Sequence, residues 1–267
     1  MAIVKGLIEI SGSIGDVTIY KRRDIDKPIM RQKGGASRQM IKTSDSFINT
    51  RKFNKEWGGC SKAGTAIRKA LYPLRHMADY NISGPLNSIA KNIQKMDKEG
   101  RLGQRAIAIS KYRQWLNGFS FNIQKPISVI VHSPFQFSIL RKEGKAIVIL
   151  PALTPGINFQ NNYNNPLLRF TAVMGIVPDF IYNPDKDEYV PKNLEVQGLN
   201  SSATTEWYPA FIPVNEKSLT LQLDSGLLAG EENTLILAVG IEFGNPLTDQ
   251  IVQQIKYSGS AIILGTA

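Results

Sequence analysis

The sequence predicts an α+β protein in which an N-terminal β-hairpin and a helical region are followed by an antiparallel β-sandwich. Polar and β-branched residues alternate near the start, apolar residues then recur at spacings of three and four, and short apolar runs separated by Gly, Pro and Asn fill the second half. We expect a basic hairpin and helical region over residues 1–118. Residues 119–267 are expected to form a sandwich of immunoglobulin-like or jelly-roll-like type.

The first 35 residues are predicted to form strands. Alternation puts Val17, Ile19 and Lys21 on one face of a strand, which is therefore apolar at its base and basic at its tip. The segment RRDID turns the chain, and Pro28 opens the return strand, a position that proline tolerates at a sheet edge. The result is a three-stranded meander, or a hairpin with one added strand.

Helices are expected between residues 44 and 118. Ser44 is a plausible N-cap for a helix that runs to Trp57, where Gly58-Gly59 would stop it. A second helix follows over residues 60–78, with an apolar stripe that includes Cys60, and Pro73 must kink or split it.

Two further helices are predicted before the sandwich. One begins at the segment Ser83-Gly84-Pro85, and a short one runs from a cap at Ser110 to Leu116. Four side chains of the first are expected to face inward, namely Leu86, Ile89, Ile93 and Met96.

Eight apolar runs are predicted to be strands of the sandwich. They are FSFNI (119–123), SVIV (128–131), FQFSIL (135–140), KAIVIL (145–150), LLRFTAVMGIV (167–177), SLTLQL (218–223), NTLILAVGIEF (233–243) and SAIILG (260–265). Glu143-Gly144 is expected to form a hairpin turn. The Asn-rich stretch 158–166 and the acidic stretch 184–191 are expected to be exposed loops.

Charge is unevenly distributed along the chain. Residues 1–125 hold 24 Lys and Arg against 9 Asp and Glu, whereas residues 126–267 hold 8 against 13. A basic half attracts polyanions or acidic protein surfaces, and an acidic half offers such a surface to a neighbouring copy. The simpler alternative is that solvated Lys and Arg lie on helices and that the division has no function.

No catalytic or metal-binding motif is recognised, and we expect neither a cofactor nor an enzymatic activity. One cysteine and two histidines, His76 and His132, are too few for a Cys/His zinc cluster. Cys60 is expected to be a buried thiol and His76 to be solvated. The Gly-rich stretches do not match a phosphate-binding loop. The chain also has paired carboxylates, which are expected to be solvated: Asp185, Asp187, Glu188, Glu231 and Glu232. A hydrolase that acts on glycans through two such carboxylates is the third functional alternative, after protein binding and nucleic-acid binding.

The first residues, MAIVKGLIEI, do not resemble a signal peptide because Lys5 and Glu9 interrupt the apolar stretch. No apolar run approaches the roughly 20 residues needed to span a bilayer. The expected location is therefore the cytoplasm, with a virion or a secreted assembly as alternatives.

The basic hairpin is the candidate functional site. Its cations are expected to bind an acidic surface on another protein or on a second copy, because a basic end and an acidic end favour head-to-tail contact. Alternatively, the hairpin binds nucleic acid, with Tyr20, Phe47, Phe53 and Trp57 available for base stacking, although Phe53 and Trp57 are more often core residues at this spacing. The candidate residues are Lys21, Arg22, Arg23, Arg31, Lys33 and Arg38.

Four segments resemble a family of uncharacterised bacterial proteins. They are SGSIGDVTIY (11–20), IMRQKGG (29–35), RKFNKEWGGCSKAG (51–64) and LAVGIEFG (237–244). Members of that family open with a glycine-punctuated hairpin and an Arg-rich helix and end in a β-rich region. The resemblance implies the same two-part architecture, and it implies no activity, cofactor or functional residue.

Overall fold

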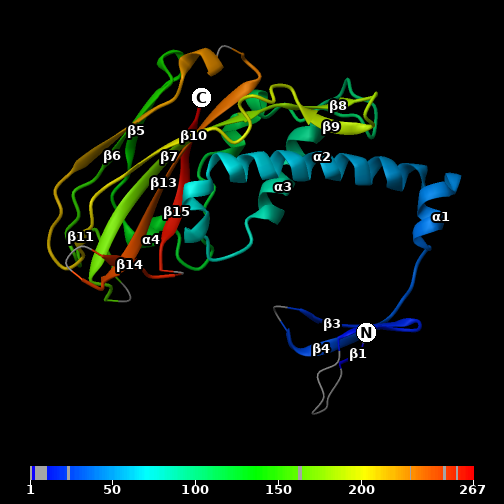
Figure 1. Cartoon of the computed structure of the whole chain (residues 1–267), viewed down its shortest axis with the longest axis horizontal. Coiled ribbons are helices and arrows are strands. Elements are labelled where there is room, and N and C mark those ends of the chain that lie inside the picture. Colours follow the sequence, from blue (N-terminus) through cyan, green and yellow to red (C-terminus); the bar gives the residue numbers. More distant parts are fainter. Residues whose placement is uncertain are drawn as a thin grey trace. The chain divides into compact units, whose positions relative to one another are not determined.

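The structure is a computed structural model that describes residues 2–3, 11–22, 25–161, 164–228, 230–248, 251–256 and 258–267. Contacts within the chain divide it into two compact units, Met1–Arg51 and Lys52–Ala267. The predicted boundary between residues 118 and 119 falls inside the second of these units. The α+β class is confirmed, because helices and antiparallel sheets are both present (Figure 1).

The first unit contains a four-stranded antiparallel sheet with the order β1-β4-β3-β2. Its strands are β1 (Ala2–Ile3), β2 (Gly12–Ile14), β3 (Val17–Arg22) and β4 (Ile25–Gln32). The turn between β2 and β3 uses Gly15 at φ 53°, a left-handed conformation that glycine adopts without steric cost. The predicted hairpin is therefore present, and it carries one more strand than the expected meander.

The helix after this sheet begins earlier than predicted. Helix α1 (Arg38–Thr43) is capped by Ser37, whose hydroxyl accepts a hydrogen bond from the Met40 amide at 3.1 Å. Ser44 follows α1 and caps no helix with its side chain. The signal at Ser37 was missed because the six residues of α1 bury no side chain and show no apolar stripe.

A single helix, α2 (Ile48–Ala70), runs straight through Gly58-Gly59, so the predicted stop there was wrong. The reason lies in the packing. The ring of Tyr189 lies against the helix at Gly59, where a Cβ would be 2.5 Å from the ring atom Cγ. The glycine is therefore needed for close approach within a helix and not for a left-handed cap. The helix ends before Pro73, as predicted, and a 3₁₀ helix (Tyr72–Met77) follows.

The other helices lie where the sequence predicts them, with differences in type. Helix α3 (Ser83–Lys95) buries Leu86 and Ile93, as expected, but leaves Met96 exposed after its last turn. Residues Ile109–Leu116 form a 3₁₀ helix. The run SVIV is not a strand, because Ile127–Ile130 forms the short helix α4 after Pro126.

The remaining strands of the second unit form a six-stranded sheet, a three-stranded sheet and a hairpin, all antiparallel. The large sheet has the order β10-β7-β13-β14, with β11 beside β7 and β15 beside β13; the three-stranded sheet has the order β12-β6-β5. The bounds are β5 (Gln136–Leu140), β6 (Lys145–Leu150), β7 (Leu167–Pro178), β8 (Phe180–Asn183), β9 (Glu188–Pro191), β10 (Asn200–Thr204), β11 (Tyr208–Pro209), β12 (Lys217–Gln222), β13 (Asn233–Pro246), β14 (Val252–Gln254) and β15 (Ser260–Thr266).

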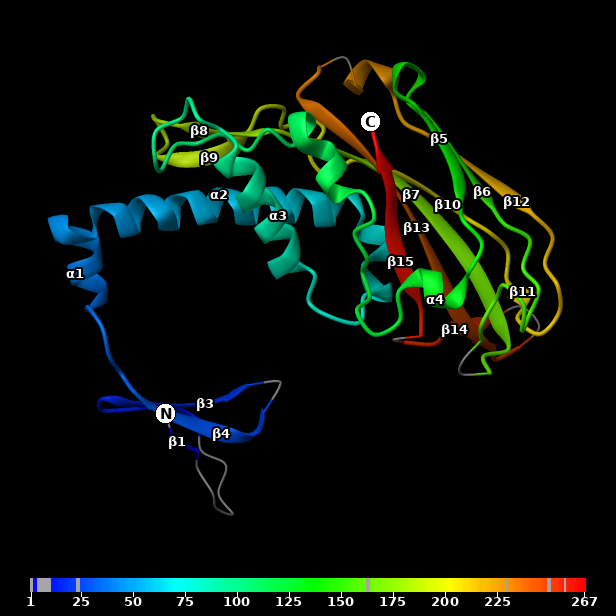
Figure 2. The same cartoon turned by 180° about the vertical axis from the view of Figure 1, so that it is seen from behind.

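The second unit has three layers: helices, the large sheet and the three-stranded sheet (Figures 1 and 2). Alternate residues of β7 and β13 face opposite sides. Val173 and Ile236 pack with the helices, whereas Met174 and Leu237 pack with the small sheet. Both central strands are therefore buried on both faces, which explains why their sequences are continuous apolar runs. The two facing sheets fit the predicted β-sandwich.

Two glycines let the helical layer approach the large sheet. A Cβ at Gly175 would collide with the carbonyl oxygen of Ala70, and one at Gly240 would collide with Sδ of Met77. Both glycines lie on central strands, where a side chain would otherwise fill the space. Close packing at these points joins the predicted helical region and the predicted sandwich within the second unit.

The strand predictions succeed for the long runs and fail for the short ones. Six of the eight predicted runs contain strands, including the β5–β6 hairpin, whose turn uses Gly144 at φ 64°. The run FSFNI forms a single bridge, from Ser120 to Ile262, while Phe121 is buried in the core and Phe119 packs against it. The acidic stretch 184–191 is the turn and second strand of the β8–β9 hairpin.

Candidate docking interface

The sheet of the first unit has two chemically different faces. In the register of the hairpin, Val17 lies opposite Gln32 and Ile19 lies opposite Met30. The neighbouring strand β2 places Ile14 opposite Val17. Residues that lie directly opposite each other share a face. We call the four side chains Ile14, Val17, Ile19 and Met30 the apolar face.

The other face of this sheet is mixed. Tyr20 lies opposite Ile29, and Thr18 lies opposite Arg31. Ile29 is buried, whereas Arg31 is exposed. Alternation along each strand therefore keeps the Arg31 side chain away from the apolar face.

The apolar face is incompletely covered. Ile14 is 70% exposed and Met30 is 38% exposed, while Val17 and Ile19 are half-buried. Among the described side chains of the first unit, Ile29 is the only buried hydrophobic one. A small sheet needs a hydrophobic face packed against another layer to be stable. The apolar face is therefore the part of this unit that is most suited to contact with another surface.

The predicted cations do not form one cluster. Lys21 and Arg22 lie at the end of β3 next to the β3–β4 turn, whereas Arg31 and Lys33 lie at the opposite end of the hairpin. Lys33 donates a hydrogen bond from Nζ to the Gly15 carbonyl oxygen at 3.0 Å. Arg38 is exposed at the start of α1.

Arg23 lies outside the described residues. The other five candidate residues are all exposed. Sequence reasoning found these cations and placed Val17 and Ile19 on one face, but it did not find Ile14 and Met30, which join that face only through the strand register.

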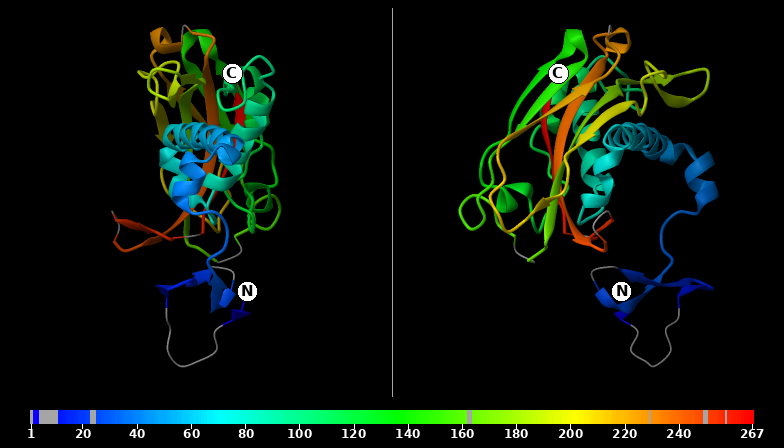
Figure 3. Two further views of the ribbon diagram at one scale, coloured as in Figure 1. Left: turned by 90° about the vertical axis from the view of Figure 1, so that its right-hand side faces the viewer. Right: turned by 60° about the vertical axis from the view of Figure 1, so that its left-hand side comes forward.

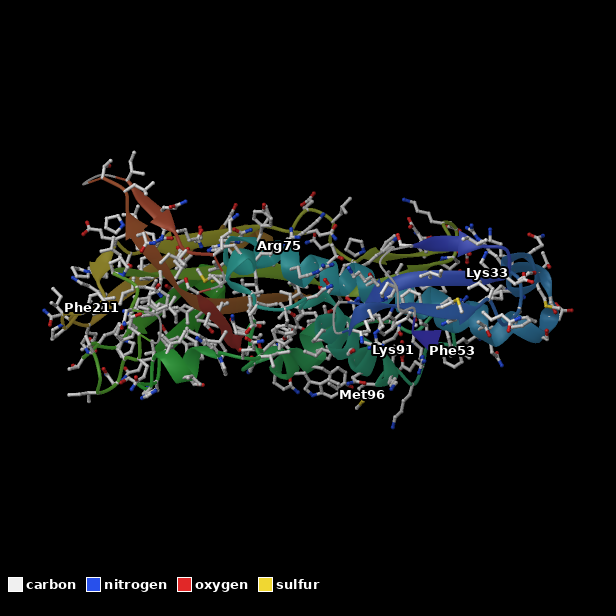
Figure 4. The ribbon with its side chains drawn as sticks, turned by 90° about the horizontal axis from the view of Figure 1, so that it is seen from below. Lys33, Phe53, Arg75, Lys91, Met96 and Phe211 are labelled. Carbon is white, nitrogen blue, oxygen red and sulfur yellow. The ribbon has the colours of Figure 1, made fainter. Side chains whose placement is uncertain are left out.

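Two aromatic side chains of α2 are exposed, although core positions were expected. Phe53 is 50% exposed and Trp57 is 47% exposed. Lys91 Nζ lies 5.9 Å from the centroid of the Phe53 ring, and Figure 4 shows both side chains. The helix buries a different stripe, which begins at Glu56 and continues through Cys60 and Ala63. The i, i+4 spacing alone cannot identify which face of a helix is buried.

A fully buried carboxylate at Glu56 joins three segments of the second unit. Arg105 donates to it from Nε at 2.7 Å and from Nη2 at 2.6 Å, and Lys91 donates at 2.6 Å. The Gly103 amide donates at 2.9 Å. Burial acts to raise the pKa of Glu56, but these hydrogen bonds outweigh it and lower the pKa from 4.5 to about 2. This cluster holds α2, α3 and the following loop together.

A second buried carboxylate, Glu242, lies on the helix-facing side of β13. His76 Nε2 lies 2.9 Å from its Oε2 and Arg169 Nε lies 2.5 Å from its Oε1. Burial acts to raise the pKa of Glu242, but the bonds to His76 and Arg169 lower it overall. Arg169 in turn lies over the ring of Trp207, with its Cζ 4.3 Å from the ring centroid. His76 is therefore exposed to solvent, as expected, but it also pairs with Glu242, which the sequence did not predict.

The acidic stretch beside β9 pairs with lysines of α2. Lys55 Nζ lies 2.5 Å from Asp187 Oδ1, and Lys62 Nζ lies 2.6 Å from Glu188 Oε2. These carboxylates thus attach the β8–β9 hairpin to α2. Within the described parts of the chain, no group of three or more His, Cys, Asp or Glu side chains could hold a metal ion.

Cys60 is buried, as predicted, and burial raises the pKa of its thiol to about 12.

A depression of about 750 Å³ lies between α3 and the 3₁₀ helix Ile109–Leu116. Asp179 borders this depression, and burial raises its pKa despite hydrogen bonds from the Ser110 amide and hydroxyl. Asp97 borders it too and accepts hydrogen bonds from three backbone amides, one of them that of Gly100. Both carboxylates therefore anchor loops.

None of the helices in the described part of the chain has the length and apolar character needed to cross a membrane. Comparison with family models, with curated proteins and with solved structures found no match to this chain.

Proposed function

We propose that this chain is a non-enzymatic structural or adaptor protein that self-associates, or docks onto another protein, through its N-terminal sheet. The observation that carries the proposal is the apolar face, where Ile14 and Met30 are exposed beside Val17 and Ile19. Contiguous exposed apolar side chains are typical of protein interaction sites. The cations at the two ends of the hairpin would steer the approach of an acidic surface and set its orientation.

The distribution of charge favours a protein partner over nucleic acid. A nucleic-acid interface is more positively charged than a protein interface, because its cations neutralise phosphates. Along β3 the apolar side chains Val17 and Ile19 precede Lys21 on the same side, so this face is apolar over most of its length and basic only beside the end of the strand, and Arg31 lies on the opposite face. Binding of nucleic acid remains the alternative, through the exposed Arg31, Lys33 and Arg38 and through Lys21 and Arg22.

The test is size-exclusion chromatography of the full chain with light scattering and absorbance at 260 and 280 nm. We expect a peak free of nucleic acid at a multiple of the 29.6 kDa chain mass. A variant with Lys21, Arg22, Arg31 and Lys33 changed to Ser should assemble more weakly, because it loses the steering charges.

Four exposed lysines of the second unit provide the matched control for this variant. The control changes Lys52, Lys95, Lys98 and Lys142 to Ser, which removes the same positive charge elsewhere. A wild-type monomer would contradict self-association. A peak with excess absorbance at 260 nm that high salt removes would instead support the nucleic-acid alternative.

A further inference from the structure

The depression of about 750 Å³ beside α3 has a wall of mixed chemistry. It is formed by the end of α3, the 3₁₀ helix Ile109–Leu116, strand β8 and the loops beside them, all within the second unit and all described by the structure. Equal numbers of lysines and carboxylates line it, namely Lys98, Lys111, Lys192, Asp97, Glu99 and Asp179. The count of charges alone therefore favours neither an anionic nor a cationic ligand.

Two of the three carboxylates are already engaged within the chain. Asp97 accepts hydrogen bonds of 2.6 to 3.0 Å from three backbone amides of its own loop. Asp179 is 3% exposed and accepts hydrogen bonds from the Ser110 amide at 2.9 Å and from the Ser110 hydroxyl at 2.7 Å. Glu99 is therefore the one exposed carboxylate of this wall.

The three lysines, in contrast, are exposed and available. Among the residues that the structure describes, the ammonium groups of Lys98, Lys111 and Lys192 have no hydrogen-bond or ion-pair partner. An ammonium group forms its strongest hydrogen bonds with an anionic oxygen. Three available cations against one available carboxylate favour an anionic ligand.

Asp179 brings two of these lysines to the same edge of the depression. Its carboxylate holds Ser110, whose neighbour in the chain is Lys111, and its carbonyl oxygen accepts a hydrogen bond from the Lys192 amide at 2.8 Å. Burial raises the pKa of Asp179, and the charge of Lys192 acts in the opposite sense, as expected for groups that lie close together. The buried carboxylate thus fixes the backbone from which both cations extend.

Apolar side chains from two further elements complete the wall. Met96 follows the last turn of α3 and is 41% exposed, and Ile181 of β8 is 36% exposed (Figure 4 shows Met96). Ile93 and Phe180 also line the depression and are buried. A ligand site usually combines such apolar walls with a few polar groups that set the orientation of the ligand.

A neighbouring depression of about 590 Å³ shows on which side of the two lysines the apolar wall lies. It shares Lys111 and Lys192 with the larger depression and adds two arginines and two glutamates. No apolar side chain of the described residues lines it. A molecule with an apolar part would therefore extend from the two lysines into the larger depression.

We infer that the larger depression binds a small anionic molecule that has an apolar body. Lys111 and Lys192 bind its carboxylate, sulfonate or phosphate group, and Met96 and Ile181 cover its apolar part. Binding of such a molecule goes beyond the proposed association through the N-terminal sheet and does not depend on it.

The experiment is a fluorescence titration of the full chain with two dyes that share one aromatic body. The dye 8-anilinonaphthalene-1-sulfonate carries a sulfonate, and N-phenyl-1-naphthylamine lacks it. The charge variant is Lys111→Gln with Lys192→Gln. Its control is Lys69→Gln with Lys142→Gln, which changes two exposed lysines that line neither depression.

A second pair of variants tests the apolar wall. The wall variant is Met96→Ser with Ile181→Ser. Its control is Ile123→Ser with Leu194→Ser, which removes two apolar side chains, 69% and 71% exposed, from outside the depression. Thermal unfolding followed by circular dichroism checks that each variant is folded.

We expect the sulfonate dye to bind the wild type more tightly than the neutral dye. The charge variant should bind the sulfonate dye about five- to tenfold more weakly, because two exposed ion pairs are lost, and should bind the neutral dye as the wild type does. The wall variant should bind both dyes about tenfold more weakly, because apolar contact area is lost. Both controls should bind like the wild type.

Several results would overturn the inference. They are a wild type that does not bind the sulfonate dye or binds both dyes equally, a charge variant that loses no more affinity than its control, and a wall variant that binds both dyes normally. Binding that is lost in Ile14→Ser with Met30→Ser and kept in the wall variant would place the dye on the N-terminal sheet, and would overturn the inference as well.

Discussion

The second unit, Lys52–Ala267, buries apolar side chains on both faces of its large sheet, whereas Ile29 is the one buried hydrophobic side chain among those described in the first unit. Figure 3 shows the helices and strands of both units in two further views. The second unit contains the buried carboxylates Glu56 and Glu242, each with cationic or histidine partners. Substitutions in the second unit should therefore change stability, whereas substitutions in the N-terminal sheet should change association.

The largest effect is expected from Glu56→Ala. The change leaves Lys91 and Arg105 without their carboxylate at a site where their side chains are 17% and 19% exposed. Removing one partner of a buried ion pair costs about 3–5 kcal/mol of unfolding free energy. Urea unfolding followed by circular dichroism measures it. The control is Glu99→Ala, an exposed carboxylate of the same loop region, and equal stability of the two variants would contradict the assigned role.

The second expected effect is a loss of stability in acid. The pKa of Glu56 is about 2 in the folded chain and 4.5 is its ordinary value, so the native state binds the proton more weakly than the unfolded state. The stabilisation is fully present above pH 4.5 and is lost as the pH falls toward 2. The difference between these two pKa values corresponds to about 3 kcal/mol of unfolding free energy, since one pKa unit is worth about 1.36 kcal/mol.

Other carboxylates also modify this acid transition, among them Asp97, whose pKa is lowered by hydrogen bonds from backbone amides despite burial. Glu242, whose pKa is also lowered, acts in the same sense as Glu56, whereas Asp179, whose pKa burial raises, acts in the opposite sense. Urea unfolding at several pH values measures the sum. In the Glu56→Gln variant, the unfolding free energy should fall less between pH 5 and pH 2 than it does in the wild type. An equal fall in both proteins would count against Glu56 as the main source of the acid sensitivity.

A smaller effect, of opposite sign at two neighbouring positions, is expected from Gly58→Ala and Gly59→Ala. A Cβ at Gly58 meets nothing within 4 Å, whereas a Cβ at Gly59 lies 2.5 Å from Cγ of the Tyr189 ring. Gly58→Ala should stabilise the helix by roughly 0.5–1 kcal/mol. Gly59→Ala should destabilise the unit by about 1–3 kcal/mol through overpacking. Thermal unfolding of both variants tests the pair. A rise in melting temperature in both variants would show that the Tyr189 ring moves aside for the new Cβ.

The smallest change in stability is expected from Ile14→Ser with Met30→Ser. Both side chains are exposed, so their replacement should change the unfolding free energy of the second unit by less than about 0.5 kcal/mol. The same variant is expected to lose self-association. A large loss of unfolding free energy would show that the apolar face stabilises the second unit, and would remove the contrast between the two units.

Patterns with a strong period predicted the fold well. The long apolar runs of β7 and β13 are strands because both of their faces are buried, and the stripe through Cys60 and Ile67 is the buried face of α2. The predictions failed where the local signal had another cause. Gly59 in α2 allows close packing and does not end the helix, and Ile127–Ile130 becomes a helix because such a short, mostly apolar run fits either structure.

The sequence by itself determined the α+β class, the position of the basic hairpin, the buried thiol and the uneven charge, because composition and periodicity depend on residues that are near one another in the chain. Only the tertiary structure decided which distant side chains meet. It placed Ile14 beside Val17 through strand register, paired Glu242 with His76 across 166 positions, and brought β11 and the end of β13 beside the start of β7. These contacts depend on how layers pack, since the partner that satisfies a buried carboxylate or extends an apolar surface lies on a different element.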